Sequence, residues 1–152
     1  MLRLVMALLQ PNRIRVLTIG KLKRSWLAEG VAFYAKRLPG LEIVELKDST
    51  QAKEAEAVRQ ARKPGERLVL LSEEGQTLDS LKFAELLSSW TSDRVALVIG
   101  GADGHATTLR QQADLLLSLS ALTLPHELAR LVLMEQLYRA STILQGSPYH
   151  RS

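Results

Sequence analysis

The end of the chain combines three side chains whose types could do chemistry together: Tyr149, His150 and Arg151. A tyrosine ring can stack or orient a ligand, an imidazole titrates near neutral pH, and a guanidinium is a permanent cation that pairs with anions. Terminal residues are commonly poorly ordered, and folding does not require this combination. We therefore interpret the tail as a candidate functional element that supplies a stacking ring, a titrating imidazole and a permanent cation.

Two further ionisable residues, Glu135 and Arg139, precede the tail on a long predicted helix. Their spacing of four residues places them on one helix face, where such pairs commonly stabilise a solvent-exposed surface. They are second candidates for catalytic residues if that face meets the site.

Three loops that follow apolar runs are candidate ligand-binding segments, at residues 71–78, 100–106 and 119–126. Ligands of open parallel sheets bind outside the carboxyl ends of the strands, where such loops lie. The loop that begins at Gly100 and Gly101 has neither the spacing of a dinucleotide-binding motif nor that of a phosphate-binding P-loop. For this loop a ligand site and a simple tight turn remain equal alternatives.

The positive charge of the chain is concentrated in its first third. Residues 1–50 hold nine Lys and Arg against four Asp and Glu, whereas the whole chain has a net charge of +4. A small group of cations, Lys21, Lys23 and Arg24, lies after the first predicted strand. Such a group could contact nucleic-acid phosphates, and a generic basic surface is the alternative interpretation.

Composition excludes several classes of site. The chain has no cysteine, which excludes disulfides, thiolate metal sites and cysteine nucleophiles. The three histidines do not have the spacing of metal ligands, so we expect no metal. The apolar run at residues 4–9 is too short to span a membrane, and we expect residues 1–12 to form an N-terminal extension that is disordered and lies outside one domain at residues 13–152.

Strands and helices are predicted to alternate along this domain. Strands are predicted at 14–19, 41–46, 68–71, 95–99 and 115–119, and helices at 25–38, 79–90 and 127–144, with Ser25 and Asp79 as N-caps. Two more helices are predicted at 50–63 and 107–113. This order and the continuous apolar strands predict an α/β fold, a parallel sheet flanked by helices. The helix at 127–144 is apolar over a wide arc, which fits either a dimer interface or a central helix of a monomer.

The stretch VIGGADG…LSLSALTLPHELARLVLMEQLYRA…SPYHRS closely resembles the bacterial large-subunit ribosomal RNA methyltransferase H family. The resemblance covers residues 13–152. It implies a SPOUT-type fold with a C-terminal deep trefoil knot, and a cytoplasmic homodimer. It also implies methylation at N3 of a pseudouridine in 23S rRNA of the assembled ribosome, with S-adenosyl-L-methionine as the methyl donor.

The resemblance assigns the three loops to the cofactor pocket, through Leu71, Gly100, Leu119, Ser120, Ala121, Leu122, Thr123 and Leu124. Many members have a histidine where this chain has Ser147, so His150 is the only imidazole of the tail. For the reaction that the resemblance implies, His150 is the candidate general base, Arg151 the partner of an anion, and Tyr149 the ring that stacks on or orients the substrate. In a dimer the tail could complete the partner's site. Two alternatives stay open: a SPOUT-fold protein that binds RNA or the ribosome without catalysis, and the same enzyme with a different RNA target.

Overall fold

The structure is a computed structural model that describes residues 6–151, so the first part of the expected extension lies outside the described residues. Its centre is one five-stranded sheet in the order β2-β1-β4-β3-β5, and every neighbouring pair of strands is parallel. The strands are β1 (Ile14–Ile19), β2 (Glu42–Leu46), β3 (Arg67–Thr77), β4 (Val95–Ile99) and β5 (Leu115–Ser118). The predicted parallel sheet is therefore confirmed.

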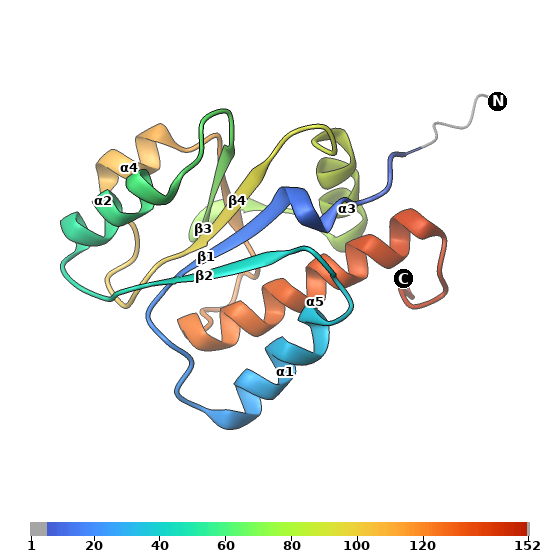
Figure 1. Ribbon diagram of the computed structural model, residues 1–152, viewed down its shortest axis with the longest axis horizontal. Coiled ribbons are helices and arrows are strands. Elements are labelled where there is room, and N and C mark those ends of the chain that lie inside the picture. Colours follow the sequence, from blue (N-terminus) through green and yellow to red (C-terminus); the bar gives the residue numbers. More distant parts are fainter. Residues whose placement is uncertain (1–5, 152) are drawn as a thin grey trace.

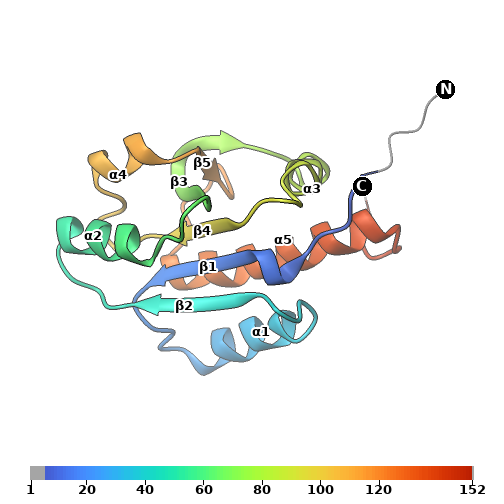
Figure 2. The same ribbon diagram turned by 45° about the horizontal axis from the view of Figure 1, so that its top comes forward.

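Helices cover both faces of this sheet (Figures 1 and 2). One face carries α1 (Ser25–Ala35), α3 (Ser80–Ser89) and α5 (His126–Gln145), and the other carries α2 (Gln51–Ala61) and α4 (Thr107–Gln112). Alternation along β4 explains the two cores, because Val95, Leu97 and Ile99 pack toward α3 and α5 while Ala96 and Val98 pack toward α2 and α4. A strand that is buried on both faces has to be apolar throughout, as the run VALVI is.

Helix α1 ends at Ala35 and not at residue 38 as predicted, and α2 ends at Ala61 and not at residue 63. Of the two predicted N-caps, one is confirmed. Asp79 caps α3, and its side chain accepts a hydrogen bond from the backbone N–H of Lys82 at 2.8 Å. The prediction for Ser25 was wrong by one residue, because Arg24 is the N-cap of α1 and makes no side-chain capping bond. The end of α5 is a left-handed residue, Gly146, with φ of 75°, a conformation that glycine adopts without strain.

Strand β3 is longer than the sequence predicts. We expected a strand at 68–71 and a loop after it, but β3 continues to Thr77. Both Leu71 and Gln76 are paired with Leu117 on β5, so residues 72–75 bulge out of the ladder between them. The polar residues of this bulge carry no alternating pattern, which is why the pattern predicted a loop.

Residues 6–10 have no regular structure but contact the C-terminal end of α3. The carbonyl oxygens of Ala7 and Leu8 accept hydrogen bonds from the hydroxyls of Ser88 and Thr91 at 2.9 and 2.7 Å.

Among the helices of residues 6–151, none has the length and hydropathy that crossing a membrane requires. The trefoil knot stays a prediction.

Candidate active site

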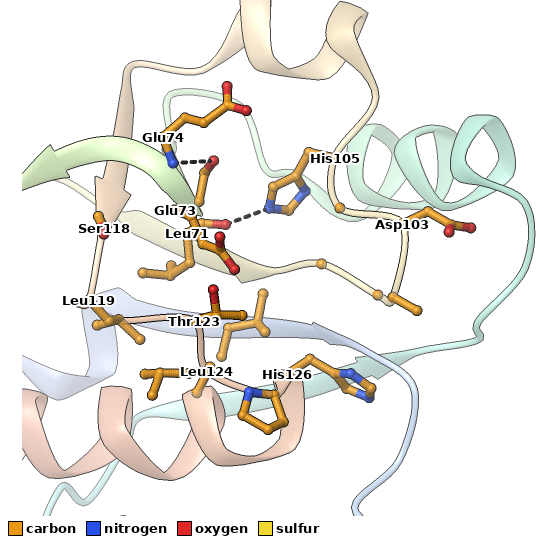
Figure 3. Close-up of a pocket in the computed structure, with 18 of the residues that line it drawn as sticks. Leu71, Glu73, Glu74, Asp103, His105, Ser118, Leu119, Thr123, Leu124 and His126 are labelled. Carbon is orange, nitrogen blue, oxygen red and sulfur yellow. Dashed lines mark hydrogen bonds between the residues drawn. The ribbon is translucent and has the colours of Figure 1, made fainter. Parts of the chain in front are cut away.

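A cavity of about 590 Å³ lies at the carboxyl ends of β4 and β5 and beside residues 71–74 of β3, next to the first turn of α5 (Figure 3). The three loops that the sequence selected form its walls. Apolar side chains alternate there with backbone groups and a few ionisable residues, the usual composition of a small-molecule site. Its volume is also within the range of such sites.

Seven of the eight predicted cofactor-binding residues line this cavity, and Ala121 does not. Two hydroxyls shape the last loop: Ser118 donates to the carbonyl oxygen of Ser120 at 2.8 Å, and the Ser120 hydroxyl accepts from the N–H of Leu122 at 2.9 Å. The side chain of Leu122 is left 76% exposed at the cavity. An apolar ligand that entered the cavity could bury this side chain.

The double glycine is explained by packing within the protein. A Cβ on Gly100 would lie 3.1 Å from Cε1 of His105, and one on Gly101 would lie 3.2 Å from a carboxylate oxygen of Glu54. Both contacts are tighter than an ordinary van der Waals contact. Glycine at both positions therefore lets this loop pack closely against His105 and Glu54 where it lines the cavity.

His105 ties two walls of the cavity together. Its Nε2 atom lies 3.0 Å from the carbonyl oxygen of Leu71, so the loop after β4 is held to β3 at the residue before the bulge. Burial lowers the pKa of the imidazole, and its hydrogen bonds to backbone groups oppose that shift. The neutral imidazole, with its proton on Nε2, is therefore the form that fits this site.

A pH dependence of stability follows from this burial. Above pH 6.5, the ordinary pKa of histidine, His105 is neutral in the folded and the unfolded chain and contributes no pH dependence. Below that pH the unfolded chain takes up a proton more readily, so the free energy of unfolding falls as pH drops through the folded pKa. We expect His105→Leu to flatten the curve between pH 7 and 5 in urea titrations.

The control for this measurement is His126→Gln, because His126 is an exposed histidine at the same cavity. That variant should keep the wild-type slope. An unchanged slope in His105→Leu would contradict the assignment.

Acidic residues at the cavity were missed by the sequence reasoning. Glu73 and Glu74 lie on the bulge of β3, and Asp103 lies on the loop after β4. Glu74 forms an ion pair with Arg110 of α4, and this contact lowers the pKa of Glu74. The candidate loops included the three acids, but nothing in the sequence indicated that Arg110 would form an ion pair with Glu74.

The cations predicted to bind RNA lie on the same edge of the sheet as the cavity. Glu127, next to the cavity residue His126, accepts hydrogen bonds from the backbone N–H of Lys23 at 2.5 Å and from Arg24 at 3.1 Å. The hydrogen bond from Lys23 lowers the pKa of Glu127. The side chains of Lys21 and Lys23 are not tied down by this contact, so they are available to a ligand that approaches the cavity.

The catalytic candidates cluster around one arginine. Arg139 lies within 2.9 Å of Glu135, within 3.1 Å of Nδ1 of His150, and 4.8 Å above the ring of Tyr149. The hydrogen bond with Glu135 raises the pKa of Arg139. Arg151 lies exposed beyond them, so Arg139 joins three of the other four candidates into one cluster.

This cluster is far from the cavity of its own chain. The cavity contacts His126 at the start of α5, whereas His150 follows the end of that helix. A helix of this length extends roughly 30 Å at 1.5 Å per residue, and Figure 1 shows the tail at the far end of α5. One chain does not bring its tail and its cavity together.

Known proteins resemble the chain over nearly all of its length. A family model described as "Predicted SPOUT methyltransferase" matches residues 12–150. Ribosomal RNA large subunit methyltransferase H of Synechococcus sp. (strain RCC307) is 79% identical over 147 residues, which cover 97% of this chain and 100% of that protein. The protein of the same name from Parasynechococcus marenigrum (strain WH8102) is 52% identical over 95% of this chain and all of its own length.

A solved structure supports the fold alone. The SpoU methyltransferase AviRb from Streptomyces viridochromogenes superposes with a TM-score of 0.51 at 18% identity, over 91% of this chain and 63% of AviRb. With the family match over residues 12–150 and full-length relatives at this identity, the chain belongs to the SPOUT methyltransferase family.

Proposed function

We propose that this protein transfers the methyl group of S-adenosyl-L-methionine to N3 of a pseudouridine in 23S rRNA, on the assembled ribosome in the cytoplasm. The observation that carries the proposal is the 79% identity, over nearly the whole chain, to a protein named ribosomal RNA large subunit methyltransferase H. The pseudouridine and its N3 atom come from the resemblance of the C-terminal motifs.

The cavity fits this cofactor in size and in chemistry. Its volume of about 590 Å³ is suited to a ligand of this size. Leu71, Leu119, Leu122 and Leu124 supply apolar surface for an adenine ring, while backbone groups of the same loops offer hydrogen bonds. When bound, the cofactor supplies an electrophilic methyl group on a sulfonium.

The tail supplies the proton chemistry in this proposal. N3–H of pseudouridine is a weak acid, so methylation requires its deprotonation, and His150 is the candidate base. The Nδ1 atom of His150 lies 3.1 Å from a guanidinium nitrogen of Arg139, and this contact orients the imidazole. Arg151 and Tyr149 bind and orient the RNA beside it.

A homodimer reconciles the tail with the cavity. Since the two lie at opposite ends of α5, we place the tail of one protomer at the cavity of the other. Trp26 and Phe33 support a second copy, because both are large, exposed side chains, 59% and 48%, seven residues apart on one face of α1. Exposed apolar surface of this kind commonly marks an interface.

RNA binding should depend on the cations near the cavity. We expect Lys21→Ala combined with Lys23→Ala to weaken binding to ribosomal RNA and to reduce the slope of log K against log salt by about 1 for each phosphate that is no longer neutralised. The measurement is filter binding or anisotropy over a salt series. Lys63→Ala is the control, because Lys63 lies shortly before β3, at the opposite edge of the sheet; an equal effect there would contradict a specific contact.

The direct test is a methyl-transfer assay with labelled cofactor on intact ribosomes, isolated subunits and naked 23S rRNA, with the modified nucleoside identified by mass. Label on pseudouridine in ribosomes is the expected result. Cofactor binding without label on any substrate would favour a different RNA target. Ribosome binding without cofactor binding would favour a non-catalytic module.

A further inference from the structure

The bulge of β3 projects an acid into the cavity. Ladder pairing with β5 stops at Leu71 and resumes at Gln76, and the register shifts between them, which leaves residues 72–75 outside the ladder. Bulges of this kind redirect side chains and are frequent beside active sites. Here the bulge brings Glu73 into the lining of the cavity, where Figure 3 shows it close to Leu71.

The bulge of β3 packs directly against the backbone of β5. A Cβ on Gly75 would lie 2.6 Å from backbone atoms of Leu116 and Leu117, so the backbone of β3 is pressed directly against β5. The N–H of Glu74 also donates to the hydroxyl of Ser72 at 3.3 Å, within the bulge. Glu73 is therefore presented by a constrained backbone.

The charges around the cavity do not neutralise Glu73. Arg110 is the arginine that lines the cavity, and it is paired with Glu74. Within residues 6–151, Glu73 forms neither an ion pair nor a side-chain hydrogen bond. Asp103 also lines the cavity, but Figure 3 shows its carboxylate pointing away from Glu73. The cavity thus presents uncompensated negative charge beside apolar surface.

This charge does not suit RNA, whose phosphates would be repelled. It suits a cation that also carries an apolar ring. S-adenosyl-L-methionine has both, since it combines adenine with a sulfonium, an ammonium and one carboxylate and carries a net positive charge near neutral pH.

We propose that Glu73 is a specificity-determining residue, which recognises the positive charge at the methionine end of the cofactor while the leucines hold the adenine. This inference rests on the proposed function of the cavity. The positive charge has two sources, the sulfonium and the ammonium, and the choice of ligands in the test distinguishes them.

The test is calorimetric binding to Glu73→Gln, which keeps the size of the side chain and removes its charge. Three ligands are compared: S-adenosylmethionine, S-adenosylhomocysteine, which lacks the sulfonium charge, and 5′-methylthioadenosine, which lacks the amino-acid group as well. We expect Glu73→Gln to weaken S-adenosylmethionine about 10-fold, the order expected for losing one opposite-charge contact at a protein surface, and to leave methylthioadenosine unchanged. A loss confined to S-adenosylmethionine assigns the contact to the sulfonium, and an equal loss for S-adenosylhomocysteine assigns it to the ammonium.

Two control variants separate a direct contact from other effects. Asp103→Asn removes the same charge from another wall of the cavity, and Glu85→Gln removes one from the exposed surface of α3. An unchanged affinity for S-adenosylmethionine in Glu73→Gln, an equal loss in Asp103→Asn, or an equal loss for methylthioadenosine would each overturn the inference. A wild-type protein that binds none of the three ligands would instead overturn the proposed function.

Discussion

Two inactive variants, mixed and allowed to exchange protomers, are expected to recover about a quarter of the wild-type rate of methyl transfer, as the two-fold symmetry of the proposed homodimer requires. One variant carries Leu122→Arg, which places a cation in the cavity. The other carries His150→Ala and Arg151→Ala, which remove the proposed base and its neighbouring cation. The tail variant alone should be slower by roughly 10²–10⁴-fold, and the cavity variant alone should lose cofactor binding and with it activity.

The recovery follows from the distance between tail and cavity. In a mixed dimer, the intact cavity of the tail variant faces the intact tail of the cavity variant, so one of the two sites is complete. Half of the dimers are mixed after random exchange. A site built within one chain would leave every mixed dimer inactive, and an absence of recovery would therefore contradict the composite site.

Neither variant is expected to disturb the fold. Leu122 is 76% exposed, so an arginine there replaces no core contact. His150 and Arg151 lie beyond the end of α5, and the proposal requires the tail variant to bind cofactor as tightly as wild type. Calorimetry on each variant before mixing checks this point, and the activity is measured as label transferred per ribosome.

The sequence was sufficient for the sheet because burial on both faces leaves a strong signal. The runs at β1 and β4 are rich in apolar, β-branched residues and are each followed by glycine, and their predicted limits are those of the structure. The bulge of β3 has no such signal. Its course depends on the fit of Gly75 against the backbone of β5, which is a tertiary contact.

The position of the cavity was predictable from topology, whereas its charges were not. Loops at the carboxyl ends of parallel strands meet at one edge of a sheet, and this rule alone selected all three walls. The contact of His105 with Leu71 joins residues 34 positions apart, and that of Arg110 with Glu74 joins residues 36 apart. The separation of the tail from the cavity was available in the sequence, since the length of the last predicted helix already implies it.

A buried ion pair between Arg15 and Glu66 should have the largest effect on stability. Two hydrogen bonds of 2.8 and 2.7 Å join the guanidinium to the carboxylate, and both residues are buried, Glu66 to 1% exposure. The pair connects β1 to the residue before β3. Arg15 also donates to the carbonyl oxygen of Ala61 at 2.7 Å, at the end of α2.

The surroundings hold both groups in their charged forms. Burial by itself raises the pKa of Glu66, but the hydrogen bonds from Arg15 and from the N–H of Lys63 outweigh it and leave the pKa below its usual value. The hydrogen bond with Glu66 raises the pKa of Arg15. Removing either partner therefore leaves the other as a buried charge without its counter-ion.

We expect Glu66→Ala to lower the free energy of unfolding by about 3–5 kcal/mol, the usual cost of an unpaired buried charge. That is a large part of the roughly 5–15 kcal/mol that is typical of a folded domain. Replacing both partners, with Arg15→Met and Glu66→Leu, should cost less than Glu66→Ala because no charge is left buried. Urea unfolding followed by circular dichroism at one fixed protein concentration measures all three proteins, since dimerisation would make stability depend on concentration.

Asp93→Asn supplies the contrast, because the ion pair of Asp93 with Arg67 is more than a third exposed on both sides. Its removal should cost no more than about 1 kcal/mol. If Glu66→Ala lowered the free energy of unfolding as little as Asp93→Asn does, water would be reaching the Arg15 guanidinium. The ion pair would then not be the contact that stabilises the packing of β1, α2 and β3, as its burial indicates. A large cost for Glu66→Ala that the double replacement relieves would show that the penalty comes from the stranded charge and not from poorer packing.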